Sequence, residues 1–138
     1  KGNNMKIAVL ALFNEKDELL CVSRKDNHET YGLIGGKVEE NEIVIEALMR
    51  EVMEETSLEL GYADFVYDVL HTENNIESRV YLFAALYDPK YIWRFNSLMN
   101  NEGCTLKWMS IHDLIKCTPY VVFYEEFRDF LIKRNVIS

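Results

Sequence analysis

The stretch from Gly35 to Leu58 constrains the fold of this chain most, because a glycine pair leads into one long amphipathic segment. Between Glu42 and Thr56 there is no proline or glycine, and apolar residues recur at the three-and-four spacing of a helix with one buried face. We therefore predict a helix over residues 42–56, with a buried side made of Ile45, Leu48, Met49, Val52 and Met53.

The same stretch concentrates negative charge. Residues 36–58 contain seven carboxylates and two cations, and so hold five of the chain's eight excess negative charges. On a helix that turns about 100° per residue, Glu51, Glu54 and Glu55 project within an arc of about 100° that borders the apolar face. Crowded carboxylates are stabilised by a cation, and their hard oxygens suit Mg²⁺ or Mn²⁺. The pattern favours metal-assisted phosphate chemistry over the alternative of a solvated acidic helix face.

The spacing of these residues resembles a known family signature. Gly36, Glu42 and Arg50-Glu51-Val52, followed by Glu54-Glu55 and Leu58, resemble the signature box of the Nudix pyrophosphohydrolases. The resemblance implies the α/β Nudix fold, a mixed β-sheet sandwiched between α-helices. It also implies hydrolysis of a diphosphate linkage in a nucleotide, with Mg²⁺ or Mn²⁺ as the cofactor. The implied catalytic residues are Glu42, Arg50, Glu51, Glu54 and Glu55, and the implied metal ligands are the Gly35 carbonyl, Glu51, Glu54 and Glu55.

The roles within this set are not all equal. Arg50 lies four residues before Glu54, so its planar guanidinium is predicted to brace the acidic row, with Glu42 as its partner. By resemblance, Glu54 and Glu55 are metal ligands, and Glu51 is either a ligand or the general base.

The signature is not matched at every position. Ser57 replaces its late glycine, so we predict that the helix ends in a left-handed conformation, which a non-glycine residue adopts at a cost of about 1 kcal/mol. Ile43 stands where a Ser or Thr would cap the helix, and Asn41 is therefore the predicted N-cap.

A second resemblance lies in residues 102–110. Glu102-Gly103, followed after four residues by Trp108-Met109-Ser110, resembles the late strand of the MutT-type Nudix members. It implies that Glu102 is a further metal ligand, rather than only a loop acid, and that a nucleoside triphosphate is converted to a monophosphate and pyrophosphate. No counterpart follows Pro119 for the Asn with which MutT-type members read the base, so a preference for oxidised guanine nucleotides is not predicted.

Two alternatives to triphosphate hydrolysis stay open. The same chemistry would serve a nucleotide-sugar or dinucleoside-polyphosphate hydrolase. A non-catalytic nucleotide-binding module is disfavoured, because such a module would be expected to lose the acids that this chain retains.

Four residues are predicted to bind the substrate. Arg24 and Lys25 follow a predicted strand and are natural partners for phosphate, although simple surface charge is the alternative. Gly36 and its neighbour Lys37 complete the set, because glycine lets the backbone approach a ligand closely.

The remaining segments predict a small α/β domain. A hairpin (6–13 and 18–23) is followed by a short extended piece (31–34), and two long strands suited to the centre of a sheet (59–71 and 76–87) flank a turn (73–75). Residues 90–101, with Trp93 and Phe95, are predicted to be a variable loop near the cleft. A short helix (111–116) and a terminal amphipathic helix follow, with Pro119 in its first turn and an apolar face of Val122, Phe123, Phe127, Phe130 and Leu131.

Composition sets the remaining expectations. With 138 residues, 49% of them hydrophobic, we expect one domain over residues 1–138, whose first four residues are a disordered or vector-derived start. The net charge of −8 argues against polymeric nucleic acid and leaves a small nucleotide as the partner. Without an apolar run near 18 residues, we expect a cytoplasmic protein without membrane contact, as a monomer or homodimer. Cys21, Cys104 and Cys117 suggest neither a disulfide nor a zinc site, and His28, His71 and His112 are placed outside the active site.

Overall fold

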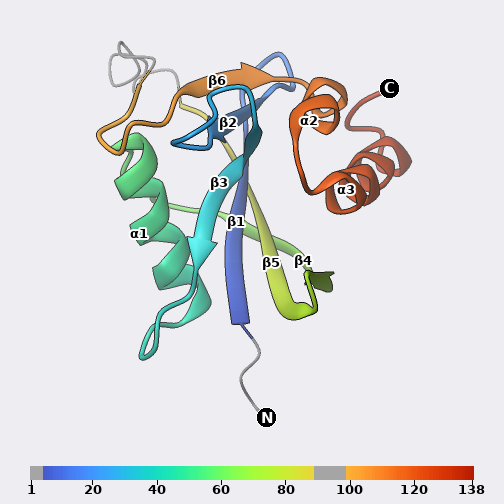
Figure 1. Ribbon diagram of the computed structural model, residues 1–138. Coiled ribbons are helices and arrows are strands. Elements are labelled where there is room, and N and C mark those ends of the chain that lie inside the picture. Colours follow the sequence, from blue (N-terminus) through green and yellow to red (C-terminus); the bar gives the residue numbers. More distant parts are fainter. Residues whose placement is uncertain (1–4, 89–98) are drawn as a thin grey trace.

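The computed structural model describes residues 5–88 and 99–138 of the chain (Figure 1). The described residues contain a six-stranded mixed sheet with the order β4-β5-β1-β3-β2-β6, and three helices. Residues 1–4 and the part of the predicted variable loop that includes Trp93 and Phe95 lie outside the described residues. The elements in chain order are β1 (Met5–Phe13), β2 (Leu19–Ser23), β3 (Tyr31–Lys37), α1 (Val44–Thr56), β4 (Asp64–Glu73), β5 (Ile76–Leu86), β6 (Leu106–Met109), α2 (Ile111–Cys117) and α3 (Val121–Lys133).

The helices lie on both faces of the sheet, which confirms the predicted α/β/α sandwich. Figure 1 shows α1 on one face and α2 with α3 on the other. Alternate residues of β1 serve the two faces, as the pleat of a strand requires. Ala8, Leu10 and Leu12 belong to the core under α1, and Ala11 belongs to the core that includes Phe127 of α3.

The predicted hairpin of the first two strands is only partly correct. In the described residues, β1 and β2 pair at Phe13 and Leu19, next to the turn, and β3 then lies between the two strands. β1 instead pairs antiparallel with β3 and in parallel with β5 along its whole length, from Met5 opposite Ser78 to Phe13 opposite Leu86. This pairing makes β1 central and carries the glycine pair of β3 directly alongside it.

The two strands predicted after the helix are both present as β4 and β5, but β4 begins later than predicted and differs in its position in the sheet. The turn is confirmed, because Asn74 and Asn75 both have the positive φ of a two-residue hairpin turn. The prediction that both strands are central is wrong for β4, which forms one edge of the sheet and begins at Asp64. Residues before it connect the helix to the strand, with Leu58 buried in the core under α1. β3 is longer than predicted and includes both glycines.

The terminal helix is confirmed with two corrections. Tyr120 is the residue that precedes the first turn of α3, so Pro119 lies before the helix and not in its first turn. Val122 is 64% exposed, whereas Tyr124 is 4% exposed and takes its place in the core. The reason is geometric, because at about 100° per residue Val122 points roughly 140° from the centre of the arc that includes Phe123 and Phe127.

Three further expectations can be compared with the structure. Cys21, Cys104 and Cys117 are all free thiols, and Cys21 is buried. The short helix is confirmed as α2, capped by Ser110, whose hydroxyl accepts from the Asp113 N–H over 3.1 Å. Within residues 5–88 and 99–138, no helix has the length and apolar character needed to cross a membrane.

Candidate functional site

Helix α1 carries the acidic row, and its two ends are held differently. The predicted N-cap is wrong: Ile43 is the capping residue, and its backbone N–H donates to the Glu46 carboxylate over 3.1 Å. Asn41 is exposed with a φ of 72° and lies too early in the chain to reach the first helical N–H groups. At the other end Ser57 has a φ of 61°, which confirms the predicted left-handed termination.

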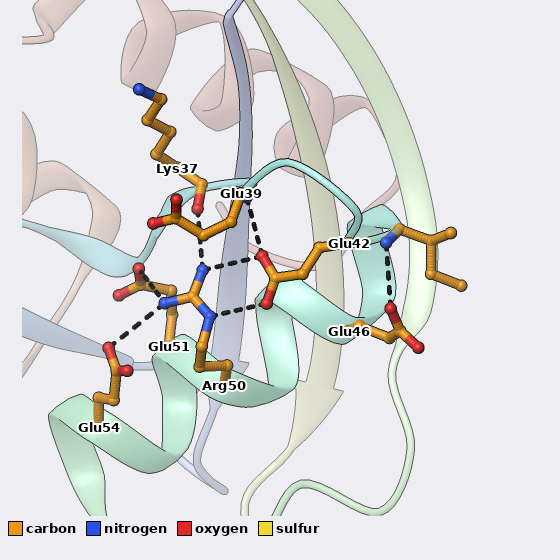
Figure 2. A network of polar contacts seen from close by, with 8 residues as sticks. Lys37, Glu39, Glu42, Glu46, Arg50, Glu51 and Glu54 are labelled. Carbon is orange, nitrogen blue, oxygen red and sulfur yellow. Dashed lines mark hydrogen bonds and ion pairs between the residues drawn. The ribbon is translucent and has the colours of Figure 1, made fainter.

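Arg50 holds the acidic row together, as Figure 2 shows. Its guanidinium binds Glu42 through two hydrogen bonds, Nε to Oε2 at 2.7 Å and Nη2 to Oε1 at 3.0 Å. Nη1 donates to Glu51 at 3.0 Å and to Glu54 at 3.4 Å, and Nη2 also donates to the Lys37 carbonyl at 3.0 Å. The predicted pairing of Arg50 with Glu42 is therefore confirmed as a contact, and Glu42 secures the arginine from the loop before the helix.

Glu55 occupies the most buried position of the row. Its Oε1 accepts a hydrogen bond from the Gly35 backbone N–H over 3.0 Å. Burial, opposed by the Gly35 hydrogen bond and helped by the negative charges of Glu51, Glu102 and Glu54, raises the pKa of Glu55 to about 8. The Glu55 carboxylate therefore lies within electrostatic range of three other acids.

Glu51 is more accessible but shares this environment. Burial raises the pKa of Glu51, while the hydrogen bond and charge of Arg50 lower it. The charges of Glu54 and Glu102 raise it as well. Glu51 and Glu55 thus each interact electrostatically with the other three predicted side-chain ligands, which come from α1 and from a turn almost fifty residues later.

The glycine pair of β3 is required by close approaches on both sides. A Cβ on Gly36 would lie 2.4 Å from the Glu51 carboxylate. A Cβ on Gly35 would lie 2.2 Å from the Ala8 carbonyl oxygen of β1. Real Cβ atoms do not approach other atoms so closely, so only glycine lets β3 pass between β1 and the acidic row.

Glu102 reaches the row from the turn that precedes β6. The side chain of Asn100 organises this turn: its Oδ1 accepts from the Glu102 and Cys104 N–H groups, each over 2.9 Å. Its Nδ2 donates over 3.0 Å to the Glu55 backbone carbonyl in the last turn of α1. Sequence reasoning missed Asn100, although an Asn two residues before Glu102 in a polar stretch is typical of a side-chain-closed turn.

The donor set fits a hard divalent cation. The charges of neighbouring acids contribute to the raised pKa of Glu51 and of Glu55, and a cation relieves such repulsion. Within the described residues, no three His, Cys, Asp or Glu side chains converge on one point as they stand. The contacts explain this arrangement, because Arg50 engages Glu51 and Glu54 while Gly35 engages Glu55. An all-oxygen set of this kind suits Mg²⁺ or Mn²⁺.

The predicted cations are dispersed around the site. Arg24 is exposed and pairs with Asp26 at 3.2 Å. Lys25 runs beside Gly103, and its charge acts on the Cys104 thiol together with those of Glu102 and Glu55, so Lys25 lies at the rim of the acidic cluster. The Lys37 side chain points away from the Arg50 guanidinium, which its carbonyl contacts (Figure 2).

A groove of about 430 Å³ opens beside the glycine pair, on the face of the sheet that carries α3. Gly35, Gly36 and Lys37 line one part of it, and Tyr120 and Phe123 line another. We call this space the α3 groove. Its lining is mostly apolar and aromatic, which is typical of a site for a small organic ligand.

His71 also lines the α3 groove, which the sequence did not predict. Its ring packs edge-on against Tyr120 with 6.0 Å between the ring centroids, and its Nε2 is buried with no hydrogen-bond partner among the described residues. The other two histidines do not line the α3 groove: His28 Nε2 is 2.9 Å from the Gly103 carbonyl oxygen, and His112 is exposed.

Solved structures with this fold include MutT-type proteins. The MutT protein of Methanosarcina mazei Go1 is 23% identical, with a TM-score of 0.71 over 91% of this chain and 94% of its own. An Ap4A hydrolase of C. elegans is 16% identical, with a TM-score of 0.67 over 92% of this chain and 98% of its own. At these identities the likeness establishes the fold.

Sequence comparison identifies the family. The mRNA-decapping enzyme subunit 2 of Saccharomyces cerevisiae is 24% identical over 106 residues, which is 77% of this chain. The chain spans only 11% of the length of that relative. The profile of the NUDIX domain matches residues 3–130, which is nearly the whole chain. The chain therefore belongs to the NUDIX domain family of hydrolases, which act on pyrophosphate bonds.

Proposed function

We propose that the protein is a Mg²⁺-dependent pyrophosphohydrolase that converts a nucleoside triphosphate into a nucleoside monophosphate and pyrophosphate. The observation that carries this proposal is the position of Glu55. Its buried carboxylate accepts from Gly35, lies within the field of three other acids, and is bordered by the glycine pair that also lines the α3 groove. The proposed metal site and the α3 groove would therefore both adjoin strand β3.

The metal is assigned to the acidic residues on chemical grounds. Glu51, Glu54, Glu55 and Glu102 would hold Mg²⁺ or Mn²⁺, with the Gly35 carbonyl as a further ligand. When bound, the ion neutralises charge on the phosphoryl oxygens and activates the attacking water. In this assignment Glu51 serves either as a ligand or as the general base.

The reaction adds one water across a phosphoanhydride bond. The water oxygen bonds to one phosphorus of the linkage, and the bond from that phosphorus to the bridging oxygen breaks. The other half of the molecule departs with the bridging oxygen, which gives the monophosphate and pyrophosphate. The base accepts one proton of the water and returns it to solvent. Arg50 keeps Glu51 and Glu54 in place through its Nη1 hydrogen bonds, and Glu42 fixes Arg50 through two more.

The α3 groove is proposed to receive the nucleoside. Aromatic rings at Tyr120 and Phe123 can pack against the face of a base, and His71 offers a polar atom among apolar neighbours. Gly36 lets the phosphates approach the backbone between the groove and the acidic row. Of the two predicted phosphate-binding cations, Lys25 is closer to the acidic cluster, so we assign it the larger effect on affinity.

The test is a substrate panel with product identification. Nucleoside triphosphates, ADP-sugars and dinucleoside polyphosphates are incubated with Mg²⁺ and then with EDTA, and ³¹P NMR distinguishes pyrophosphate from phosphate. We expect metal-dependent turnover of a triphosphate to monophosphate and pyrophosphate, and a loss of at least about 100-fold in Glu54→Gln. Turnover of only the ADP-sugars or dinucleoside polyphosphates would contradict the proposed substrate but would still support hydrolysis of a diphosphate linkage. Binding without turnover of any compound would support a binding module instead.

A capped RNA is a useful additional substrate, because the yeast relative is named as a decapping enzyme. The chain carries a net charge of −8, whereas binding to a nucleic acid polymer depends on clustered cations. We therefore expect a free cap-like dinucleotide to be hydrolysed no worse than the capped RNA. A strong preference for the RNA would contradict the assignment to small nucleotides.

A further inference from the structure

Asn100 connects two parts of the acidic cluster that are distant in the sequence. Its Oδ1 accepts from the N–H groups of Glu102 and Cys104, so the side chain closes the turn that carries Glu102. Its backbone N–H also donates to the Cys104 carbonyl over 2.8 Å. Because the side-chain Oδ1 accepts two hydrogen bonds and the side-chain Nδ2 donates a third, the amide has one defined orientation.

The other half of the amide reaches helix α1. Nδ2 donates over 3.0 Å to the backbone carbonyl of Glu55. Carbonyl groups in the last turn of a helix lack intrahelical partners, so this acceptor is available only at the helix end. The left-handed Ser57 terminates the helix at this point, and its own N–H donates to Met53. Asn100 therefore contacts α1 at the residue whose carboxylate is the most buried of the row.

A second contact supports the same turn from another direction. The His28 ring Nε2 lies 2.9 Å from the Gly103 carbonyl oxygen, and because a carbonyl can only accept, Nε2 is the donor in this hydrogen bond. The turn from Asn100 to Cys104 is thus held by α1 on one side and by the loop between β2 and β3 on the other. Glu102, at the centre of the turn, lies within electrostatic range of both Glu51 and Glu55.

We infer that Asn100 is a positioning residue for metal binding, which fixes Glu102 at a set distance from Glu55 through one amide side chain. This inference rests on the proposed function, because it takes Glu102 and Glu55 as ligands of the same site. Removing the amide frees the turn from the helix without removing any carboxylate. Substituting a residue that hydrogen-bonds to a metal ligand and orients it typically weakens metal affinity by about 10- to 100-fold.

The experiment measures Mn²⁺ affinity without substrate. Metal-stripped protein is titrated with Mn²⁺ and the free ion is followed by EPR for the wild type, Asn100→Ala, Asn100→Ser and the matched control Asn101→Ala. The serine variant retains a short side-chain acceptor for the turn but cannot reach Glu55. We expect both Asn100 variants to bind Mn²⁺ about tenfold more weakly, and the control to stay within about twofold.

A double-mutant cycle separates positioning from general damage. If Asn100 acts through Glu102, then Asn100→Ala in a Glu102→Gln background changes Mn²⁺ affinity by less than about twofold. In turnover, the Asn100 variants should need more Mg²⁺ for half-maximal rate while kcat at saturating Mg²⁺ stays within about threefold. Far-UV circular dichroism checks that each variant is folded. If Asn100→Ala does not fold, the test of the positioning role rests on Asn100→Ser.

The outcomes distinguish this inference from the proposed function. Unchanged Mn²⁺ affinity in both Asn100 variants, or an equal loss with and without Glu102, would overturn the positioning role. Wild-type protein that binds Mn²⁺ with the expected dependence on Asn100 but hydrolyses no triphosphate would overturn the proposed function alone. Wild-type protein that binds no Mn²⁺ would overturn both.

Discussion

The Gly35 backbone N–H donates to the Glu55 carboxylate over 3.0 Å, which ties the central region of the sheet to the most buried acid of helix α1. This one hydrogen bond does not compensate for the burial of Glu55 and for the acids around it, because the pKa of Glu55 is still raised to about 8. Its protonation is therefore linked to folding.

The stability of the metal-free protein should fall as pH rises from about 4.5 to about 8. In this window the folded state retains a proton on Glu55 that the unfolded chain has lost, and a state that binds more protons is destabilised by their removal. Chemical denaturation at several pH values measures the slope, and Glu55→Gln should flatten it. Mg²⁺ should stabilise the wild type more at pH 8 than at pH 6, because at pH 8 a smaller fraction of Glu55 carries a proton that the ion must displace. A flat profile in the wild type would contradict the assignment.

Gly36→Ala should lower turnover by about 100-fold or more, because the new Cβ would lie 2.4 Å from the Glu51 carboxylate and displace it. The matched control is Gly61→Ala, where an added Cβ meets nothing within 4 Å. Steady-state kinetics with the preferred triphosphate compares the two, with thermal unfolding as a check on the fold. Near-normal turnover in Gly36→Ala would show that Glu51 tolerates displacement and has no essential role.

Arg50→Lys should reduce kcat by about 10- to 100-fold although the charge is conserved. A lysine ammonium cannot reproduce the two-pronged contact with Glu42 while also reaching Glu51 and Glu54. Arg79→Lys provides the control, since Arg79 pairs with Asp68 on the β4–β5 side of the sheet. Equal rates in both variants would mean that charge alone, without geometry, is what Arg50 contributes.

His71→Ala should raise KM for the nucleotide by about tenfold and leave kcat within about threefold, because His71 lines the α3 groove and not the acidic row. His112→Ala is the companion variant, and it should leave both parameters within about threefold, as expected for an exposed ring. If His112→Ala raised KM and His71→Ala did not, the nucleotide would bind outside the α3 groove, on another face of the molecule.

Local patterns predicted the parts of the site that lie on one element. The acidic arc placed Glu51, Glu54 and Glu55 on α1. Leu48 and Val52 are buried as predicted, but the predicted burial of Met49 and Met53 is wrong, because they lie at the edge of the apolar arc and are 38% and 43% exposed. The left-handed end at Ser57 was predicted from the resemblance, because the family signature has a glycine at this position. The N-cap was mispredicted because residue type was given more weight than position. Asn41 is a good capping residue type, but the N-cap is Ile43, two residues later, and the helix begins at Val44.

Features that depend on pairing between distant segments were not predictable in this way. The sequence favoured a simple hairpin of the first two strands, and nothing local indicated that β3 would lie between them. Asn100 and His71 likewise acquire their significance from tertiary contacts, with Glu55 in one case and Tyr120 in the other. Neither residue belongs to a sequence pattern that predicts these contacts, because their partners are 45 or more residues away along the chain.

The parallel pairing of β1 with β5 has a consequence for how the protein assembles. Met5 lies opposite Ser78, so the two central strands join positions 73 residues apart, and the glycine pair with helix α1 lies within the intervening loop. Closing so long a loop is entropically unfavourable and slows folding relative to local contacts. A nascent chain that has not yet reached β5 lacks the partner strand on one side of β1. The acidic row and the strand that supports it should therefore become protected from hydrogen exchange together, late in folding, and not as an early local unit.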